Sequence, residues 1–221
     1  MSVPALRFRD NDGQDFPEWE EKRLGDVFTF IQTNSFSRAL LNYDSGIVKN
    51  IHYGDIHTKF SSNFRIKNED VPFINENVDI SNISADCYCK EGDLVIADAS
   101  EDYADIGKTI EIINTNNEKL LAGLHTYIAR DLTQKMSLGF SGYLMQIESV
   151  RLQIKILATG ISVLGISKGN LGKVQLKIPS LLEQTKIANF LNAIDDKITN
   201  NKIQLDALKQ YKQGLLQQMF V

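Results

Sequence analysis

Hydrophobic residues recur at alternating intervals of four and three positions along the C-terminal part of the chain. This heptad spacing is typical of a helix that pairs with another helix in a coiled coil. The ten positions of the repeat, eight of them apolar, are Ile187, Leu191, Ile194, Ile198, Asn201, Leu205, Leu208, Lys212, Leu215 and Met219. We therefore predict a long dimerisation helix over residues 180–221, with Ser180 as its N-cap and Glu183 completing a capping box.

The predicted helix is longer than a small domain could cover, because it spans about 57 Å at 1.5 Å per residue. We expect its apolar stripe to pack against a partner helix of similar length, from a second copy of the chain or from a different chain. A helix packed only on its own domain is the alternative. Asn201 and Lys212 interrupt the stripe, and polar residues at such positions commonly set register and partner choice.

The region before this helix carries short strand-like runs separated by Gly, Asn, Asp and Ser. The clearest runs are residues 47–51, 93–97 and 109–113. Apolar and polar residues alternate strictly over 173–178, which predicts a strand with one buried face. Residues 141–158 carry apolar side chains at helical spacing, and Gly160 is placed to cap that helix.

These patterns predict an α+β fold in three parts. Residues 1–27 form a polar lead-in, residues 28–179 form one irregular mixed α/β domain, and residues 180–221 form the long coiled-coil helix. No stretch approaches the roughly 18 consecutive apolar residues that a membrane span needs. The N-terminus has no apolar signal core. We therefore expect a cytoplasmic protein.

Charge is distributed unevenly along the chain. The net charge of −4 argues, for the chain as a whole, against binding to nucleic acid. Residues 28–67 and 119–182, however, carry net charges of +3 and +6, and they flank residues 68–118, which carry −11. A fold that brings the two basic blocks together would create a basic face. Chance variation of surface charge is the alternative explanation.

The residues that could support catalysis or bind a metal are few. Cys87 and Cys89 supply too few ligands for a structural zinc site, and two small residues on one face of a strand explain them better. The three histidines, His52, His57 and His125, are not spaced as a metal-binding helix pair. The sequence contains no P-loop, dinucleotide fingerprint, zinc-deaminase pattern, nucleophile elbow or N-P-P-[YF]-like methyltransferase motif.

Carboxylates in the acidic block could in principle bind Mg²⁺ for a nuclease. The relevant residues are Asp98, Glu101, Asp102 and Asp105. Within residues 68–118, no lysine stands in the short Glu-x-Lys spacing that metal-dependent nucleases favour, so a solvated acidic face is the better interpretation. We therefore predict no catalytic site and no metal site in this chain.

Four stretches of the chain together resemble the specificity (S) subunit of type I restriction-modification systems. They are FPEWEEKRLGDVF, VKNIHYGDIHTKF, AGLHTYIARDL and GISVLGISKGNLGKVQLKIPSLLEQTKIANFLNAIDDKI. The last is the most specific, because a strand, a proline and an E-Q-x-x-I-A helix start follow one another. A typical S subunit resembles two such units in tandem, whereas this chain has room for one. We therefore expect a half-length form with a single target-recognition domain.

The resemblance implies a subunit that binds double-stranded DNA and carries no catalytic activity. It implies that two helices pack antiparallel as a spacer between two recognition domains. Methyltransferase subunits using S-adenosylmethionine would dock on the helices, and a restriction subunit using ATP and Mg²⁺ could join, so these cofactors belong to partners. A coiled-coil adaptor that binds only proteins is an alternative, and a metal-dependent nuclease is a weaker one.

Residues that could contact DNA were chosen for their chemistry, because base readout uses polar side chains on protruding segments and phosphate contacts use Lys and Arg. The loop expected from Tyr53 to Lys59 and the polar turn at residues 167–170 are the strongest candidates. The predicted DNA-binding residues are Tyr53, His57, Thr58, Lys59, Lys108, His125, Lys168 and Asn170. Lys108 and His125 are weaker candidates than the rest, as is Arg130, and a solvated surface residue is the alternative for each.

Overall fold

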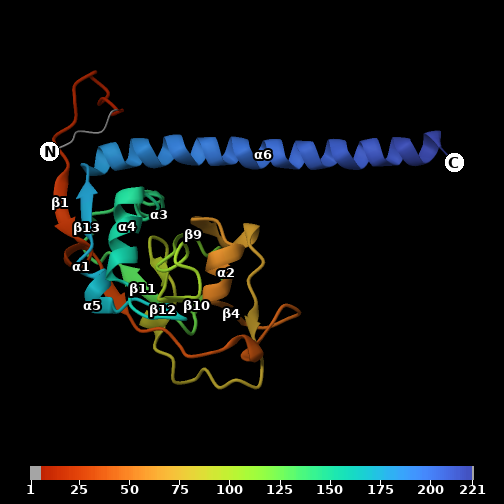
Figure 1. The fold of residues 1–221 in the computed structure, drawn as a ribbon, viewed down its shortest axis with the longest axis horizontal. Helices are drawn as coiled ribbons and strands as arrows, with labels where there is room; N and C mark the ends of the chain where they lie inside the picture. Colours follow the sequence, from red (N-terminus) through yellow and green to blue (C-terminus); the bar gives the residue numbers. More distant parts are fainter. Residues whose placement is uncertain (1–5, 221) are drawn as a thin grey trace.

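The computed structural model describes residues 6–220 as a mixed α/β domain followed by one helix, α6 (Leu181–Met219), of 39 residues. Figure 1 shows α6 running straight along one side of the domain and continuing beyond it. The α+β class and the long C-terminal helix predicted from the sequence are confirmed.

A five-stranded sheet forms the centre of the domain. Its order is β2 (Thr29–Ile31), β11 (Thr126–Arg130), β7 (Leu94–Ala97), β9 (Thr109–Asn114) and β5 (Asn63–Arg65). The pairs are antiparallel except for β5 and β9, which run parallel. Alternate residues of β7 lie in different core clusters: Leu94 and Ile96 in one, Val95 and Ala97 in the other. The sheet is therefore buried on both faces, which explains the unbroken apolar run of this strand.

Smaller sheets surround the central one. A four-stranded sheet has the order β10 (Lys119–Ala122), β4 (Val48–Ile51), β6 (Phe73–Ile74) and β3 (Leu41–Asn42). Two antiparallel pairs complete the strands: β1 (Glu20–Arg23) with β13 (Gln175–Ile178), and β12 (Leu164–Gly165) with β8 (Ala99–Ser100). The short helices are α1 (Leu24–Val27), α2 (Tyr53–Thr58), α3 (Ser141–Leu144), α4 (Glu148–Leu157) and α5 (Lys168–Leu171). Three 3-10 turns lie at Arg38–Leu40, Ile66–Asn68 and Ala85–Cys87.

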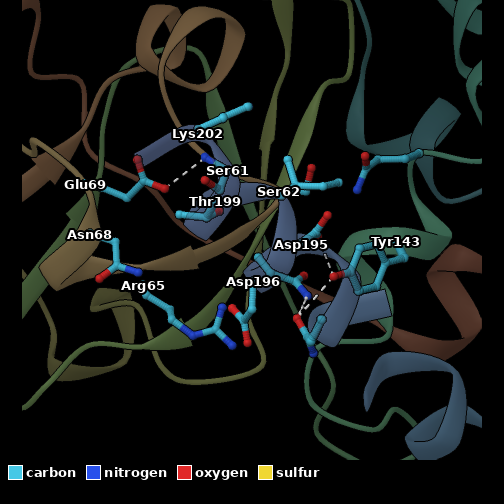
Figure 2. Close-up of a pocket in the computed structure, with 14 residues that line it drawn as sticks. Ser61, Ser62, Arg65, Asn68, Glu69, Tyr143, Asp195, Asp196, Thr199 and Lys202 are labelled. Atoms are coloured by element: carbon cyan, nitrogen blue, oxygen red, sulfur yellow. Dashed lines mark hydrogen bonds between the residues drawn. The ribbon is translucent and has the colours of Figure 1, made fainter. Parts of the chain in front are cut away.

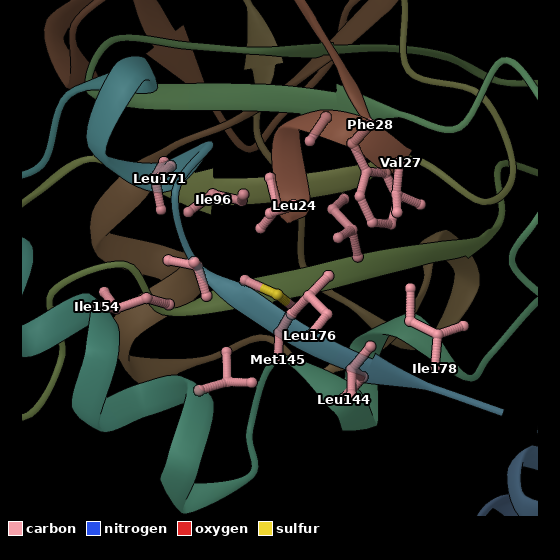
Figure 3. Packing of buried hydrophobic residues seen from close by; sticks show 14 of the residues in the cluster. Leu24, Val27, Phe28, Ile96, Leu144, Met145, Ile154, Leu171, Leu176 and Ile178 are labelled. Carbon is pink, nitrogen blue, oxygen red and sulfur yellow. The ribbon is translucent and has the colours of Figure 1, made fainter. Parts of the chain in front are cut away.

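The larger core cluster joins the two ends of the domain (Figure 3). Leu24 and Val27 from α1 pack there with Leu176 and Ile178 from β13. Residues 20–27, which the sequence analysis placed in a lead-in, are therefore part of the domain in the structure. The alternation over 173–178 is confirmed, since Val174, Leu176 and Ile178 are buried.

Three local expectations are wrong. The single helix over 141–158 is broken into α3 and α4, because Ile147 is extended and starts a new helix. Gly160 does not cap α4, whose C-cap is Ala158; it lies instead in the following turn. Cys87 ends a 3-10 turn rather than lying in a strand, and Cys89 is buried beyond it.

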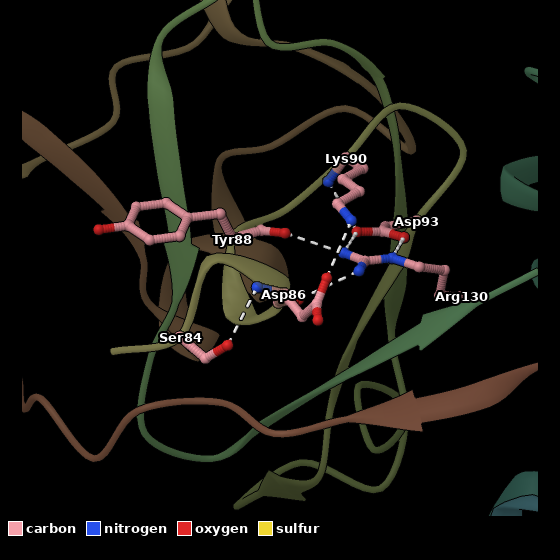
Figure 4. Close-up of polar contacts among 6 residues, drawn as sticks. All are labelled: Ser84, Asp86, Tyr88, Lys90, Asp93 and Arg130. Atoms are coloured by element: carbon pink, nitrogen blue, oxygen red, sulfur yellow. Dashed lines mark hydrogen bonds and ion pairs between the residues drawn. The ribbon is translucent and has the colours of Figure 1, made fainter. Parts of the chain in front are cut away.

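A buried ion pair lies beside the segment that carries these cysteines (Figure 4). The Arg130 guanidinium donates to both carboxylate oxygens of Asp93 at 2.7 Å, and also to the backbone carbonyls of Asp86 and Tyr88 at 3.0 and 2.8 Å. These carbonyls are thus satisfied by a side chain instead of a neighbouring strand. Arg130, one of the weaker candidates, is buried, and its guanidinium is occupied by these bonds.

The start of α6 is fixed by side chains that turn back to the domain. Ser180 caps the helix as predicted, with Oγ accepting from the backbone N–H of Glu183 at 3.4 Å. Glu183 does not complete the predicted capping box, because its carboxylate accepts from Arg7 and Trp19 instead. Gln184 is buried and donates to the carbonyls of Lys135 and Pro179.

Candidate nucleic-acid interface

All three histidines of the chain surround the ring of Tyr53. The ring centroids of His52, His57 and His125 lie 4.7, 5.7 and 5.3 Å from that of Tyr53. His57 and His125 meet Tyr53 edge to face. The stretch that was expected to be a loop is the helix α2, which holds Tyr53 and His57 on a fixed frame.

The protonation of two of these histidines is set by their surroundings. His52 is the N-cap of α2, and its Nδ1 accepts from the backbone N–H of Gly54 at 3.1 Å, so this nitrogen carries no proton. Burial lowers the pKa of His52 and of His57 below the ordinary value of 6.5. Nε2 of His57 is buried and has no hydrogen-bond partner among residues 6–220. At neutral pH both side chains are therefore uncharged.

An open hollow of about 400 Å³ lies beside His125. It is lined by Asp98, His125, Tyr127, Val163 and Ser167, among others. Nδ1 of His125 lies 3.3 Å from a carboxylate oxygen of Asp98, and burial raises the pKa of Tyr127 to about 12. Tyr127 therefore remains a neutral hydroxyl that can donate or accept a hydrogen bond.

Two predicted cations belong to this part of the surface. The Lys168 ammonium lies 5.2 Å from the centroid of the Tyr127 ring, in a cation–π contact. The Lys108 ammonium donates to the backbone carbonyl of His57 and lies 3.6 Å from Asp105. Five predicted residues are thus linked through shared neighbours: Tyr53, His57, Lys108, His125 and Lys168.

Lys59 belongs to a second cluster at the C-terminal end of α2. Its ammonium donates to the Tyr43 hydroxyl at 3.1 Å and lies 3.4 Å from Asp55. Arg38 approaches the same carboxylate at 2.8 Å and the same hydroxyl at 2.9 Å. Because two exposed cations share one buried carboxylate, the cluster keeps positive charge at the surface. Sequence reasoning missed Arg38 and Tyr43, which only the surplus of basic residues over 28–67 could have suggested.

Two predicted residues have side chains that bond within the protein. Nδ2 of Asn170 donates to the carbonyl of Leu157 at 3.0 Å, and its Oδ1 accepts from Lys173 at 3.1 Å. The Thr58 hydroxyl donates to the carbonyl of Gly54 within α2 at 2.9 Å, although Thr58 is exposed. The turn predicted at 167–170 is the start of the helix α5, with Ser167 as its N-cap.

A polar hollow of about 340 Å³ separates the domain from α6 (Figure 2). The Tyr143 hydroxyl donates to Asp195 at 2.6 Å, and burial raises the pKa of that hydroxyl. Nδ2 of Asn63 donates to Oδ1 of Asn192 at 2.8 Å. These bonds fix the direction of α6 relative to the domain.

The apolar stripe of α6 is covered by the domain only at its start. Ile187 packs against the larger core cluster and Leu191 is half-buried. Every later member is exposed: Ile194, Ile198, Asn201, Leu205, Leu208, Lys212, Leu215 and Met219. Asn192 and Asp195 face the domain. The stripe member Ile198 lines the same hollow, although 46% of it is exposed. The stripe is therefore open to a partner helix.

Within residues 6–220, no three His, Cys, Asp or Glu side chains gather in a way that could hold a metal ion. No helix in the same part of the chain has the length and apolar character required to cross a membrane.

Comparisons with known proteins agree with one another. A family model described as "Type I restriction modification DNA specificity domain" matches residues 17–210. No curated protein sequence matches the chain significantly.

Three solved structures share the fold. The crystal structure of a type I restriction-modification system S subunit from M. genitalium is 15% identical, with a TM-score of 0.59 over 90% of this chain. A structure titled for complex assembly and conformational transition of the type I R-M system is 17% identical, with a TM-score of 0.56 over 87%. The HsdS subunit from Thermoanaerobacter tengcongensis is 17% identical, with a TM-score of 0.52 over 85%. The matches cover 43%, 42% and 40% of those chains, so this chain spans less than half their length.

Proposed function

Because the chain belongs to the family of type I restriction modification DNA specificity domains, we propose that it is a sequence-specific DNA-binding subunit of such a system. It reads one half of a bipartite target in double-stranded DNA and serves as a scaffold for methyltransferase subunits. The observation that carries the proposal is the family match over residues 17–210, which includes both the domain and most of α6.

The geometry supports two different roles for the residues on the surface around Tyr53: contacts to phosphates and contacts to bases. Lys108, Lys168 and the Arg38–Lys59 pair supply cations for phosphate contacts, which position a protein on DNA. His57, His125 and Tyr53 supply polar and aromatic groups that can face base edges. Burial lowers the pKa of His57, and a neutral imidazole carries one donor and one acceptor.

Catalysis belongs, in this proposal, to partner subunits. Methyltransferase subunits bring S-adenosylmethionine, and a restriction subunit, where present, brings ATP and Mg²⁺. The exposed stripe of α6 supplies the surface for self-association or for pairing with a second half-specificity subunit. The purified chain should therefore neither cleave nor methylate DNA when S-adenosylmethionine and Mg²⁺ are present.

Selection from a pool of random-sequence duplexes tests the proposal. The purified full chain should enrich a defined motif, with and without a type I methyltransferase subunit added. Lys168→Ala should weaken binding to all sequences and lower the salt dependence by about one phosphate contact. Lys209→Ala, which removes an exposed lysine from the part of α6 beyond the domain, is the matched control and should change neither.

Enrichment of no sequence under either condition would contradict the proposal. Binding to the methyltransferase subunit without any DNA binding would indicate a protein–protein adaptor instead. Cleavage or methylation that persists through purification would show that the chain is itself an enzyme.

A further inference from the structure

We propose that Ile161 is a specificity-determining residue that contacts the 5-methyl group of a thymine in the major groove. The inference rests on the proposed function, because it assigns a role on the same DNA-binding surface. Ile161 is 102% exposed, so it makes almost no contact with its own domain. Val163, two residues further on, is also exposed.

The turn that carries Ile161 is held in a fixed shape. The backbone N–H of Thr159 donates to the carbonyl of Gly165 at 2.9 Å, and the N–H of Gly165 donates to the carbonyl of Thr159 at 2.7 Å. Leu164 and Gly165 also pair with β8. A rigid tip loses little conformational entropy when it binds, so an apolar side chain held there can contribute affinity.

Gly160 determines the path of this turn. Its φ of +133° is a conformation that other residues rarely adopt. A Cβ at this position would lie 2.0 Å from the carbonyl oxygen of Val163. An alanine at Gly160 would therefore displace the tip without removing Ile161.

The turn adjoins the candidate DNA-binding residues. Val163 lines the same hollow as His125 and Ser167, and the next residue, Lys168, contacts Tyr127 across it. The segment 119–182 carries a net charge of +6, which favours a negatively charged partner. Duplex DNA is the partner that matches both the charge and the neighbouring polar side chains.

The width of the turn indicates which groove of the DNA it enters and which group of a base Ile161 contacts there. Thr159 and Gly165 pair in one isolated antiparallel bridge, so two chain segments lie side by side at the base of the turn. The major groove is about 12 Å wide and admits a two-stranded ribbon, whereas the minor groove is about 6 Å wide. The thymine methyl is the apolar group that base pairs present in the major groove. An isoleucine tip entering that groove therefore reads thymine.

The test uses the full chain and the duplex that it enriches from a random pool. Each thymine of that duplex is replaced singly by uracil, which removes only the 5-methyl group. One replacement should weaken binding of the native chain about fourfold, as expected for one buried methyl group. The same replacement should have no effect on Ile161→Ala or Gly160→Ala. Ile47→Ala, which removes another isoleucine that is 83% exposed, is the matched control and should keep the native sensitivity.

Equal sensitivity to uracil in the native chain and in Ile161→Ala would overturn the inference, as would a motif without any sensitive thymine. A loss of affinity in Ile161→Ala that is uniform over all sequences would also overturn it, because it would indicate a wedge or a structural role. A native chain that enriches no motif would instead show that the proposed function has failed, and the inference with it.

Discussion

The guanidinium of Arg7 and the carboxylate of Glu183 form a two-point ion pair between residues 176 positions apart in the sequence. The two bonds measure 3.0 and 2.7 Å, and the Glu183 side chain is 0% exposed. The Trp19 indole donates to the same carboxylate at 3.1 Å. Hydrogen bonding to Glu183 raises the pKa of Arg7, so the guanidinium stays charged over the physiological range. The pair joins the N-terminal segment to the first turn of α6.

Arg7→Met should destabilise the protein by about 3 kcal/mol, because removing one partner leaves a buried carboxylate without its charge partner. Urea unfolding at neutral pH measures the loss. Trp19 is the single tryptophan of the chain, so its fluorescence also reports whether this junction opens before the domain unfolds.

Arg9→Met is the control for this prediction, since Arg9 and Asp15 form an ion pair that is largely exposed. Exposed pairs contribute about 0–1 kcal/mol. Equal destabilisation by the two substitutions would show that burial of Glu183 is not the cause.

The parts of the fold that were predictable are those with a local pattern. The heptad repeat and the Ser180 cap predicted α6 because each signal lies within a few turns of one helix. The strand at β7 was predictable from four consecutive apolar residues. In contrast, β1 pairs with β13 across some 150 residues, and no property of residues 20–23 alone indicates that partner.

The candidate site was also predictable only where the signal is local. Chemistry pointed to Tyr53, His57 and His125 individually, but the contact between Tyr53 and His125 depends on the tertiary fold. Asn170 has suitable chemistry for reading a base, yet its side chain is bonded to Leu157 and Lys173. A sequence displays which groups a residue carries, but not which of those groups are already satisfied.

The contribution of His52 and His57 to stability should be lost as the pH falls below about 6.5, because folding lowers the pKa of both side chains. In this window the unfolded chain binds more protons than the folded one, so protonation favours unfolding. His52→Asn should reduce the slope, since asparagine can cap α2 as His52 does but does not titrate. The free energy of unfolding, measured in urea at pH 7.5 and 5.5, gives the slope for each protein.

Glu111 changes the pH dependence of stability in the opposite direction. Burial raises its pKa to about 7, so its contribution to stability is present at low pH and is lost as the pH rises from 4.5 to 7. The native curve combines these opposite effects. The pH dependence of the free energy of unfolding must therefore be compared between the native chain and His52→Asn. An unchanged slope in His52→Asn would show that the ring of His52 does not resist protonation.

Leu205→Asp should convert a dimer into monomers without unfolding the domain. Leu205 is 53% exposed, and a dimer would bury it in the seam, where an unpaired charge costs several kcal/mol. Sedimentation equilibrium at tens of micromolar measures the change. Ile203→Asp is the matched control, because Ile203 is 63% exposed but lies off the heptad repeat. A native chain that is monomeric at this concentration would contradict self-association through the stripe.

If two copies pair through their α6 helices in antiparallel fashion, the target should be a palindrome of two short blocks separated by unspecified base pairs. A two-fold axis through the middle of the helix pair places the two domains at opposite ends and in opposite orientations, so their half-sites are inverted repeats. The 39 residues of α6 span about 58 Å, which exceeds one duplex turn of about 34–36 Å.

Each domain, however, lies beside the first part of its helix, where Asn192 and Asp195 face it. The half-site centres are therefore closer than the helix ends, about one turn apart and on the same face of the duplex. Sequencing the methylated sites in a strain with this chain as its sole specificity subunit measures the motif. A continuous motif would exclude the antiparallel homodimer. An asymmetric bipartite motif would show that the chain pairs with a second, different half, whose own domain reads the other block.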